Sequence, residues 1–137
     1  MKKISIFALV LVLALAMMAC RKGHMIEPVS YDAPEQTLTL KQMRGAIARG
    51  CIARQWHVAE VDPNTIEATI TVRGKHRAVV TIPFTNNHYE IKYKSSANLE
   101  YELKDGVEYI HPHYISWIRN LDNSIQTEIG ALKYGRK

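Results

Sequence analysis

The sequence predicts a two-layer α+β domain in which a four-stranded antiparallel meander is covered on one face by an N-terminal and a C-terminal helix. Residues 38–137 begin and end with segments whose apolar residues recur at helical spacing. Between those segments, apolar and polar side chains alternate along several short runs. The expected sheet therefore has one apolar face, and two amphipathic helices are the simplest cover for it.

The first helix is expected to begin after Thr39, because Gln42 completes a capping box with this N-cap. It should end near Gln55. Gly45 and Gly50 should both allow close approach to the sheet. The buried face is expected to comprise Met43, Ala46, Ile47, Gly50 and Cys51.

Four strands are expected at 57–61, 66–73, 77–84 and 89–94. Pairing of their apolar faces places Ile66 opposite Phe84 and Val72 opposite Ala78, with 74–76 as the loop. It also places Arg73 opposite Arg77. The following hairpin is predicted to pair Phe84 with Tyr89, Val80 with Tyr93 and Val79 with Lys94.

The register of the first strand stays open at this point, because a four-residue turn buries Ala59 and Val61 and a three-residue turn buries Val58. Residues 95–110 are expected to be irregular, with a small hairpin possible at Asp105-Gly106. A second helix should start near Pro112. Its apolar stripe is Tyr114, Trp117, Ile118, Leu121, Ile125, Ile129 and Leu132.

The first residues predict export. Lys2 and Lys3 precede an uncharged apolar run, Ile4 to Ala19, which ends at Cys20. This pattern resembles a bacterial lipoprotein signal, which implies removal of residues 1–19 and acylation of Cys20. An ordinary secretory signal cut after Ala16, giving a soluble periplasmic or secreted protein, is the alternative. Because Arg21 rather than Asp follows the cysteine, the resemblance implies the periplasmic face of the outer membrane.

Residues 20–37 are expected to form the lipidated cysteine and a flexible tether, because Pro28 and Pro34 interrupt a polar stretch with few apolar residues. Residues 38–137 then form a single domain. Acylation of Cys20 would leave Cys51 without a partner in the chain, and its place on an apolar helix face indicates burial.

A basic corner of the sheet is the first candidate surface, formed by Arg73, Lys75, Arg77 and Lys94. The adjoining segment contributes Ser95, Ser96 and Asn98. Such a surface suits an envelope protein or an anionic envelope ligand, although a solvated polar face explains the same pattern. The formal charge of +5 is too mild to indicate nucleic acid.

The histidines show no ligand spacing such as HExxH, and the serines lack a GxSxG context, so no metal site, cofactor or catalytic residue is predicted. His111 is expected to lie in the cap region of the second helix. Trp56 and Trp117 are expected to pack in the core.

Three segments, 38–56, 89–99 and 110–121, together with the signal, resemble a family of small proteobacterial outer-membrane lipoproteins of unassigned activity. The resemblance covers most of the mature chain and implies no catalytic residues. The resulting hypothesis is a non-catalytic, membrane-anchored periplasmic binding or accessory module of the cell envelope. A binder of small anions is the alternative, followed by an enzyme of unknown type.

Overall fold

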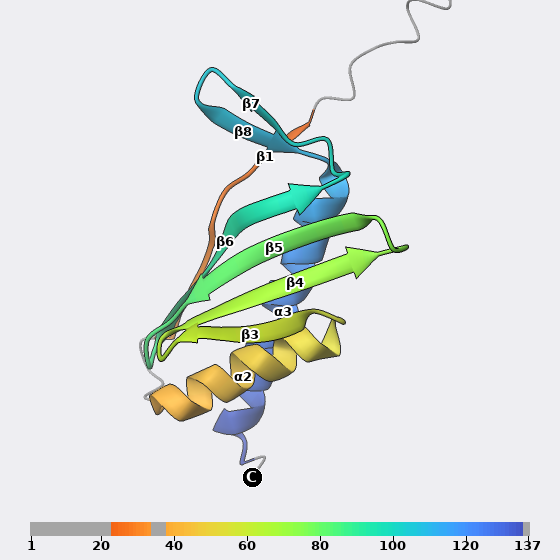
Figure 1. The fold of residues 1–137 in the computed structure, drawn as a ribbon. Coiled ribbons are helices and arrows are strands. Elements are labelled where there is room, and N and C mark those ends of the chain that lie inside the picture. Colours follow the sequence, from red (N-terminus) through yellow and green to blue (C-terminus); the bar gives the residue numbers. More distant parts are fainter. Residues whose placement is uncertain (1–22, 34–37, 136–137) are drawn as a thin grey trace, which may run out of the picture.

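The structure is a computed structural model that describes residues 23–33 and 38–135 (Figure 1). The expected signal peptide, Cys20 and residues 34–37 lie outside the described residues. The N-terminal elements are β1 (His24–Met25), β2 (Val29–Asp32) and α2 (Leu40–Ala53). The central strands are β3 (His57–Asp62), β4 (Thr65–Val72), β5 (His76–Pro83) and β6 (His88–Ala97). The chain continues through β7 (Glu102–Lys104), β8 (Val107–Ile110) and α3 (Pro112–Lys133).

The α+β class is confirmed, but the described residues form two antiparallel sheets rather than one. A five-stranded sheet has the order β2-β6-β5-β4-β3, and a three-stranded sheet has the order β1-β8-β7. The four expected strands are β3 to β6, and they form the expected meander. Strand β2 adds a fifth strand beside β6 (Figure 1).

Strands β1 and β2 lie in the segment that was expected to be a flexible tether, so residues 23–33 belong to the fold. His24 pairs with Ile110 of β8, and Val29 pairs with Ile91 of β6. Both strands are short edge strands whose hydrogen-bond partners come from distant parts of the chain. Local composition does not reveal partners that are distant in sequence, so the sequence did not predict β1 and β2.

Helix α2 follows its prediction closely. Thr39 and Gln42 form the reciprocal capping box, with hydrogen bonds of 2.9 and 3.1 Å. The buried residues of the helix are Met43, Ala46, Ile47, Gly50 and Cys51. The close approach at Gly50 is to α3 and not to the sheet, because a Cβ atom here would lie 2.7 Å from the Cα atom of Ile125.

The β4–β5 register is displaced by two residues from the predicted one. Ile66 pairs with Ile82, and Val72 pairs with His76 across the three-residue turn 73–75. Arg73 and Gly74 both have positive φ, 55° and 70°, which closes this turn. Because strands have a period of two, the displacement leaves every side chain on its predicted face.

The β5–β6 pairing is confirmed at first, with Phe84 opposite Tyr89 and Val80 opposite Tyr93. A β-bulge then shifts the register, so Val79 lies opposite Ser95 rather than Lys94. In β3, Val58 pairs with Ala68 and is half-buried, which decides the alternative that the sequence left open.

Residues 95–110 are more regular than expected. Strand β6 continues to Ala97, and β7 and β8 form a hairpin that turns at Asp105 and Gly106. These two residues have φ values of 51° and 76°, as a primed two-residue turn requires.

Helix α3 begins at Pro112, as predicted, and runs behind the five-stranded sheet (Figure 1). Its buried residues are Tyr114, Ile118, Leu121, Ile125 and Ile129. One hydrophobic core joins them to α2 and to the apolar face of β4, β5 and β6. Trp56 is buried in this core, whereas Trp117 is half-buried at its border.

Candidate functional site

The predicted basic corner has a different pairing from the expected one. Arg73 and Lys75 lie in the β4–β5 turn, whereas Arg77 lies in β5 opposite Thr71. Arg73 therefore does not face Arg77. The ammonium group of Lys94 donates to the carboxylate of Glu67 across the polar face, so its charge is matched there.

The segment that follows Lys94 is ordered by the sheet. Ser95 and Ser96 belong to β6, and Ser96 shares a 2.8 Å hydrogen bond with the hydroxyl of Tyr93. Asn98 comes just after the strand, and its Nδ2 donates to the Lys75 carbonyl over 2.7 Å. Of these three residues, Asn98 is the one that reaches the β4–β5 turn.

A cavity of about 480 Å³ lies between this turn, residues 98–100 and the start of α3. We call it the histidine pocket. Its lining residues are Val72, Arg73, His76, Asn98, Leu99, Glu100, His111, His113, Ser116 and Trp117. Arg73 and Asn98 are thus the two predicted site residues that the structure brings into one cavity.

Backbone conformations that side chains rarely adopt are concentrated around the histidine pocket. Arg73, Asn98 and Glu100 have φ values of 55°, 56° and 55°. Such left-handed residues persist where the surrounding contacts hold them, and they cluster at binding sites. Here the holding contacts include His76, whose Nδ1 donates to the Asn98 carbonyl over 2.8 Å.

The start of α3 forms another wall of the pocket. His111 is the N-cap, and its Nδ1 accepts from the backbone N–H of His113 over 3.1 Å. In the neutral ring, Nε2 is then the hydrogen-bond donor. The two imidazole rings lie edge to face with their centroids 4.4 Å apart. The N-terminus of this 22-residue helix also contributes partial positive charge.

The histidine pocket therefore gathers one permanent cation, three imidazoles and one carboxylate. Within residues 23–33 and 38–135, neither Arg73 nor Glu100 takes part in a salt bridge. Their charges remain available to a ligand. Across the same described residues, no group of three or more His, Cys, Asp or Glu side chains is placed to hold a metal ion.

The sequence did not predict this pocket, because its histidines were considered as metal ligands or, for His111, as a residue of the helix cap. The residues that were missed as a site are His76, Glu100, His111, His113, Ser116 and Trp117. A usable signal was present in His111-Pro112-His113, which places two imidazoles at a predicted helix start. Their neighbours in the β4–β5 turn are distant in sequence, and only the fold reveals them.

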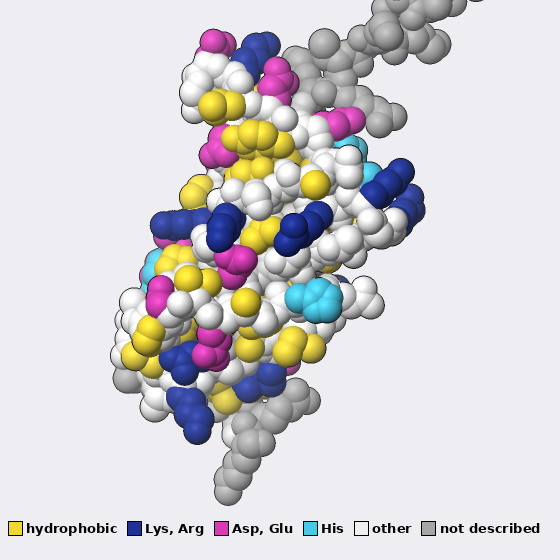
Figure 2. All heavy atoms as spheres, viewed as in Figure 1, with side chains coloured by type: hydrophobic (Ala, Val, Ile, Leu, Met, Phe, Trp, Pro, Cys, Tyr) yellow, Lys and Arg dark blue, Asp and Glu magenta, His cyan; other side chains and the backbone are white. Residues whose placement is uncertain are grey.

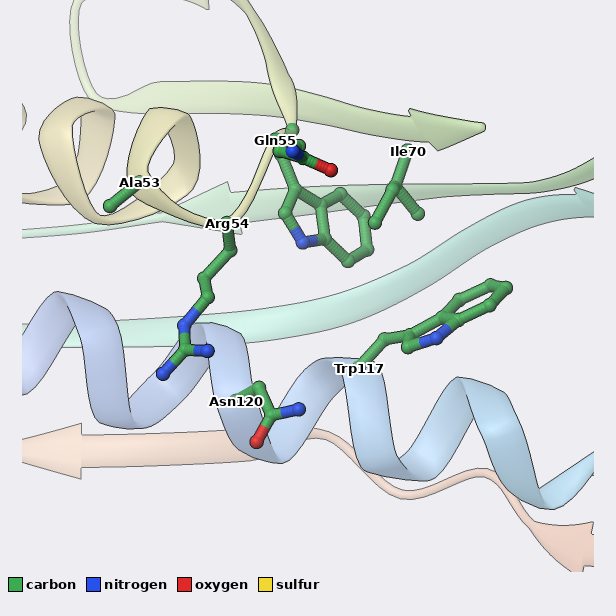
Figure 3. Close-up of a pocket in the computed structure, with 7 residues that line it drawn as sticks. Ala53, Arg54, Gln55, Ile70, Trp117 and Asn120 are labelled. Carbon is green, nitrogen blue, oxygen red and sulfur yellow. The ribbon is translucent and has the colours of Figure 1, made fainter. Parts of the chain in front are cut away.

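A second cavity of about 290 Å³ lies where α2 ends beside α3. Figure 3 shows Arg54 extending from the end of α2 toward α3, where Asn120 projects beside it. Trp117 lines both this cavity and the histidine pocket. With one cation and a smaller volume, the second cavity is the weaker candidate.

Cys51 is not a candidate nucleophile. Its side chain is fully buried, and this burial raises the pKa of the thiol to about 12. The reactive thiolate is therefore scarce at neutral pH. Burial likewise raises the pKa of Tyr114, whose ring packs edge-on against Tyr93 with centroids 5.7 Å apart.

Among the described residues, no helix has the length and apolar character that a membrane span needs. Comparison with known proteins returned no matching family profile, no matching curated protein and no matching solved structure.

Proposed function

We propose that this chain is a non-catalytic binding module of the bacterial envelope, anchored through acylated Cys20 at the periplasmic face of the outer membrane. We propose further that the histidine pocket binds an anionic group of its ligand. The signal-like first twenty residues support the anchor. The anion site is supported by Arg73, which lines one cavity with His111 and His113 at the positively polarised N-terminus of α3.

The volume of the histidine pocket, about 480 Å³, suits a small ligand. A guanidinium group forms charge-assisted hydrogen bonds with oxyanions, and Nε2–H of His111 adds a further donor. The N-terminus of α3 contributes only its partial positive charge, because Pro112 has no N–H and the N–H groups of His113 and Tyr114 already donate to His111. The carboxylate of Glu100 makes the site selective, since it disfavours a ligand that carries only negative charge.

The polar face of the sheet is the less favoured surface. Lys94 is paired with Glu67, and Lys92 lies 3.4 Å from Glu90. Intrastrand and cross-strand pairs of this kind are typical of a solvated face and contribute little to binding. This arrangement favours the histidine pocket over the sheet face as the anion site.

Titration of the chain with inorganic phosphate, followed by amide NMR, tests the anion site. Shifts are expected at residues 98–100 and 111–113. Arg73→Gln should weaken phosphate binding by about tenfold, because a hydrogen bond to a charged group contributes about 1.5–3 kcal/mol. Arg77→Gln is the matched control, since Arg77 does not line the pocket. Equal losses in the two variants would contradict the proposal.

The anchor is tested by the intact mass of the chain extracted from bacterial membranes. The expected product begins at Cys20 and carries the mass of its acyl chains. Cys20→Ser should abolish both the added mass and the cut before residue 20, because the lipoprotein signal couples both steps to the cysteine. A wild-type product that begins at Met17 without added mass would instead support the ordinary secretory signal.

A further inference from the structure

The described chain enters the fold almost directly after the proposed anchor. Gly23 already packs on β8, because a Cβ atom at this position would lie 3.1 Å from the Cβ atom of Tyr109. The next residue, His24, pairs with Ile110. Only Arg21 and Lys22 separate Cys20 from Gly23. At about 3.3–3.6 Å per residue, the backbone spans about 11 Å at most over the three steps from Cys20 to Gly23.

The same end of the molecule carries the histidine pocket. Ile110, the partner of His24, is followed directly by His111, which lines the pocket and caps α3. Figure 1 shows the described chain beginning beside the end of β8 and the start of α3. In Figure 2, histidine and basic side chains gather on the flank at this end. An anchor at Cys20 would therefore hold the pocket at the membrane surface.

We infer that the histidine pocket binds the headgroup of a phospholipid in the leaflet that holds the anchor, and that this headgroup carries an ammonium beside its phosphate. The inference rests on the anchor and the anion site proposed above. Arg73 and Nε2–H of His111 suit the phosphate, whereas Glu100 suits the ammonium. A headgroup with both charges matches the mixed charge of the pocket better than a purely anionic one.

The short connection makes a weak site effective. Tethering turns headgroup capture into an intramolecular event, whose effective concentration reaches the millimolar range for short linkers. Arg21 and Lys22 lie in the connection itself, and basic residues near an anionic surface add about 1 kcal/mol each. A headgroup therefore need not bind tightly in solution to be held at the membrane.

A soluble titration tests the headgroup chemistry. An unacylated chain that begins at Arg21 is titrated with inorganic phosphate, glycerophosphoethanolamine and glycerophosphoglycerol. Glycerophosphoethanolamine should bind about tenfold more tightly than glycerophosphoglycerol, which corresponds to one favourable charge contact. Glu100→Gln should abolish this preference and should strengthen the binding of inorganic phosphate, because it removes a like charge from the pocket. Equal affinity for the two glycerophosphodiesters would overturn the ammonium assignment.

A vesicle experiment tests the membrane geometry. The naturally lipidated chain is placed in vesicles of phosphatidylethanolamine with phosphatidylglycerol, or of phosphatidylglycerol alone. Amide hydrogen exchange is then measured at residues 98–100 and 111–116. Exchange should be slower in the mixture. A ten-residue Gly/Ser insertion between Lys22 and Gly23 should remove most of the slowing, and Arg73→Gln should do the same.

The two experiments separate the possible failures. If no phosphate compound binds in solution, the anion site of the proposed function fails. If phosphate compounds bind in solution but exchange is unchanged in vesicles, the pocket serves a free phosphate ligand and only the membrane inference fails. If exchange slows in vesicles but is insensitive to Arg73→Gln, the membrane merely covers this end and the inference is overturned.

Discussion

Gly50 lies where α2 packs most closely on α3, and this contact allows a sharp test of the packing. A Cβ atom at position 50 would lie 2.7 Å from both Cα and Cγ1 of Ile125 and 2.8 Å from its backbone nitrogen. Ordinary contacts of this kind begin at 3.4 Å. Two of the three atoms are backbone atoms, so the clash is relieved only if one helix moves.

Two opposing terms determine the effect of Gly50→Ala. Alanine favours the helix by about 0.8–1.0 kcal/mol relative to glycine. Overpacking against backbone costs about 3 kcal/mol, the upper end of the usual range. The hydroxyl of Ser124 donates to the Gly50 carbonyl over 3.0 Å, and a shift of α2 would weaken this bond as well. We expect Gly50→Ala to lower the free energy of unfolding by about 2 kcal/mol.

Gly45→Ala is the matched control in the same helix. A Cβ atom at this position would meet only the end of the Arg49 side chain, with Nη1 at 3.0 Å, and this flexible group can move. The helical preference of alanine should then dominate, so Gly45→Ala should stabilise the fold by about 0.5–1 kcal/mol. The two substitutions are chemically identical and are expected to have opposite signs.

Urea unfolding followed by circular dichroism measures both effects. The slope of free energy against urea should be the same in the two variants, since the surface exposed on unfolding is unchanged. If Gly50→Ala is neutral or stabilising, the close approach of α2 and α3 at this position is wrong.

Three further predictions concern single side chains. In the Cys20→Ser chain, Cys51 should react with iodoacetamide only when the chain unfolds. Burial raises the pKa of the Cys51 thiol from 9.0 to about 12, so the stability that the buried neutral thiol contributes is complete below pH 9 and is lost as the pH approaches 12. Rapid labelling under native conditions would argue against this burial. Tyr89→Phe removes a 2.6 Å hydrogen bond to the Asp122 carboxylate and should cost about 1–2 kcal/mol in urea unfolding. Tyr31→Phe should cost less, because within the described residues the Tyr31 hydroxyl makes no hydrogen bond and its ring still stacks on Tyr89. Gly106→Ala, at a φ of 76°, should cost about 1 kcal/mol and speed hydrogen exchange in β7 and β8 while leaving α2 unchanged.

The two helices were predictable because their signals are local. Thr39 and Gln42 lie three residues apart, and Pro112 marks the first residue of α3. The spacing of apolar residues also identified the buried face of each helix. A capping box and a period of 3.6 residues are complete within a single segment, so no distant contact is needed to read them.

The strands were predictable in their faces but not in their partners. Alternation placed Ile66 and Val80 on the apolar side, yet it is compatible with any even displacement of one strand along its neighbour. The positive φ of Arg73 moved the β4–β5 turn by one residue and displaced the register by two. A bulge beside Val79 changed the pairing again.

The candidate site was only partly predictable, for the same reason. Arg73 and Asn98 were named from the sequence as parts of a basic surface, but His76, Glu100 and His111 were not linked to them. These five residues come from the β4–β5 turn, the start of β5, the segment after β6 and the N-cap of α3. Their proximity depends on the register and on the pairing of β6 with β5, neither of which a single segment contains.

By itself, the sequence determined the α+β class, both helices, the apolar face of the sheet and the expectation of an anchor at Cys20. Tertiary structure decided the rest. It placed β1 and β2 in the fold, which leaves two residues between Cys20 and Gly23 where a long flexible tether was expected. The physical reason is that an edge strand is stabilised by the backbone hydrogen bonds of its neighbour, and those partners are defined only once the rest of the chain has folded.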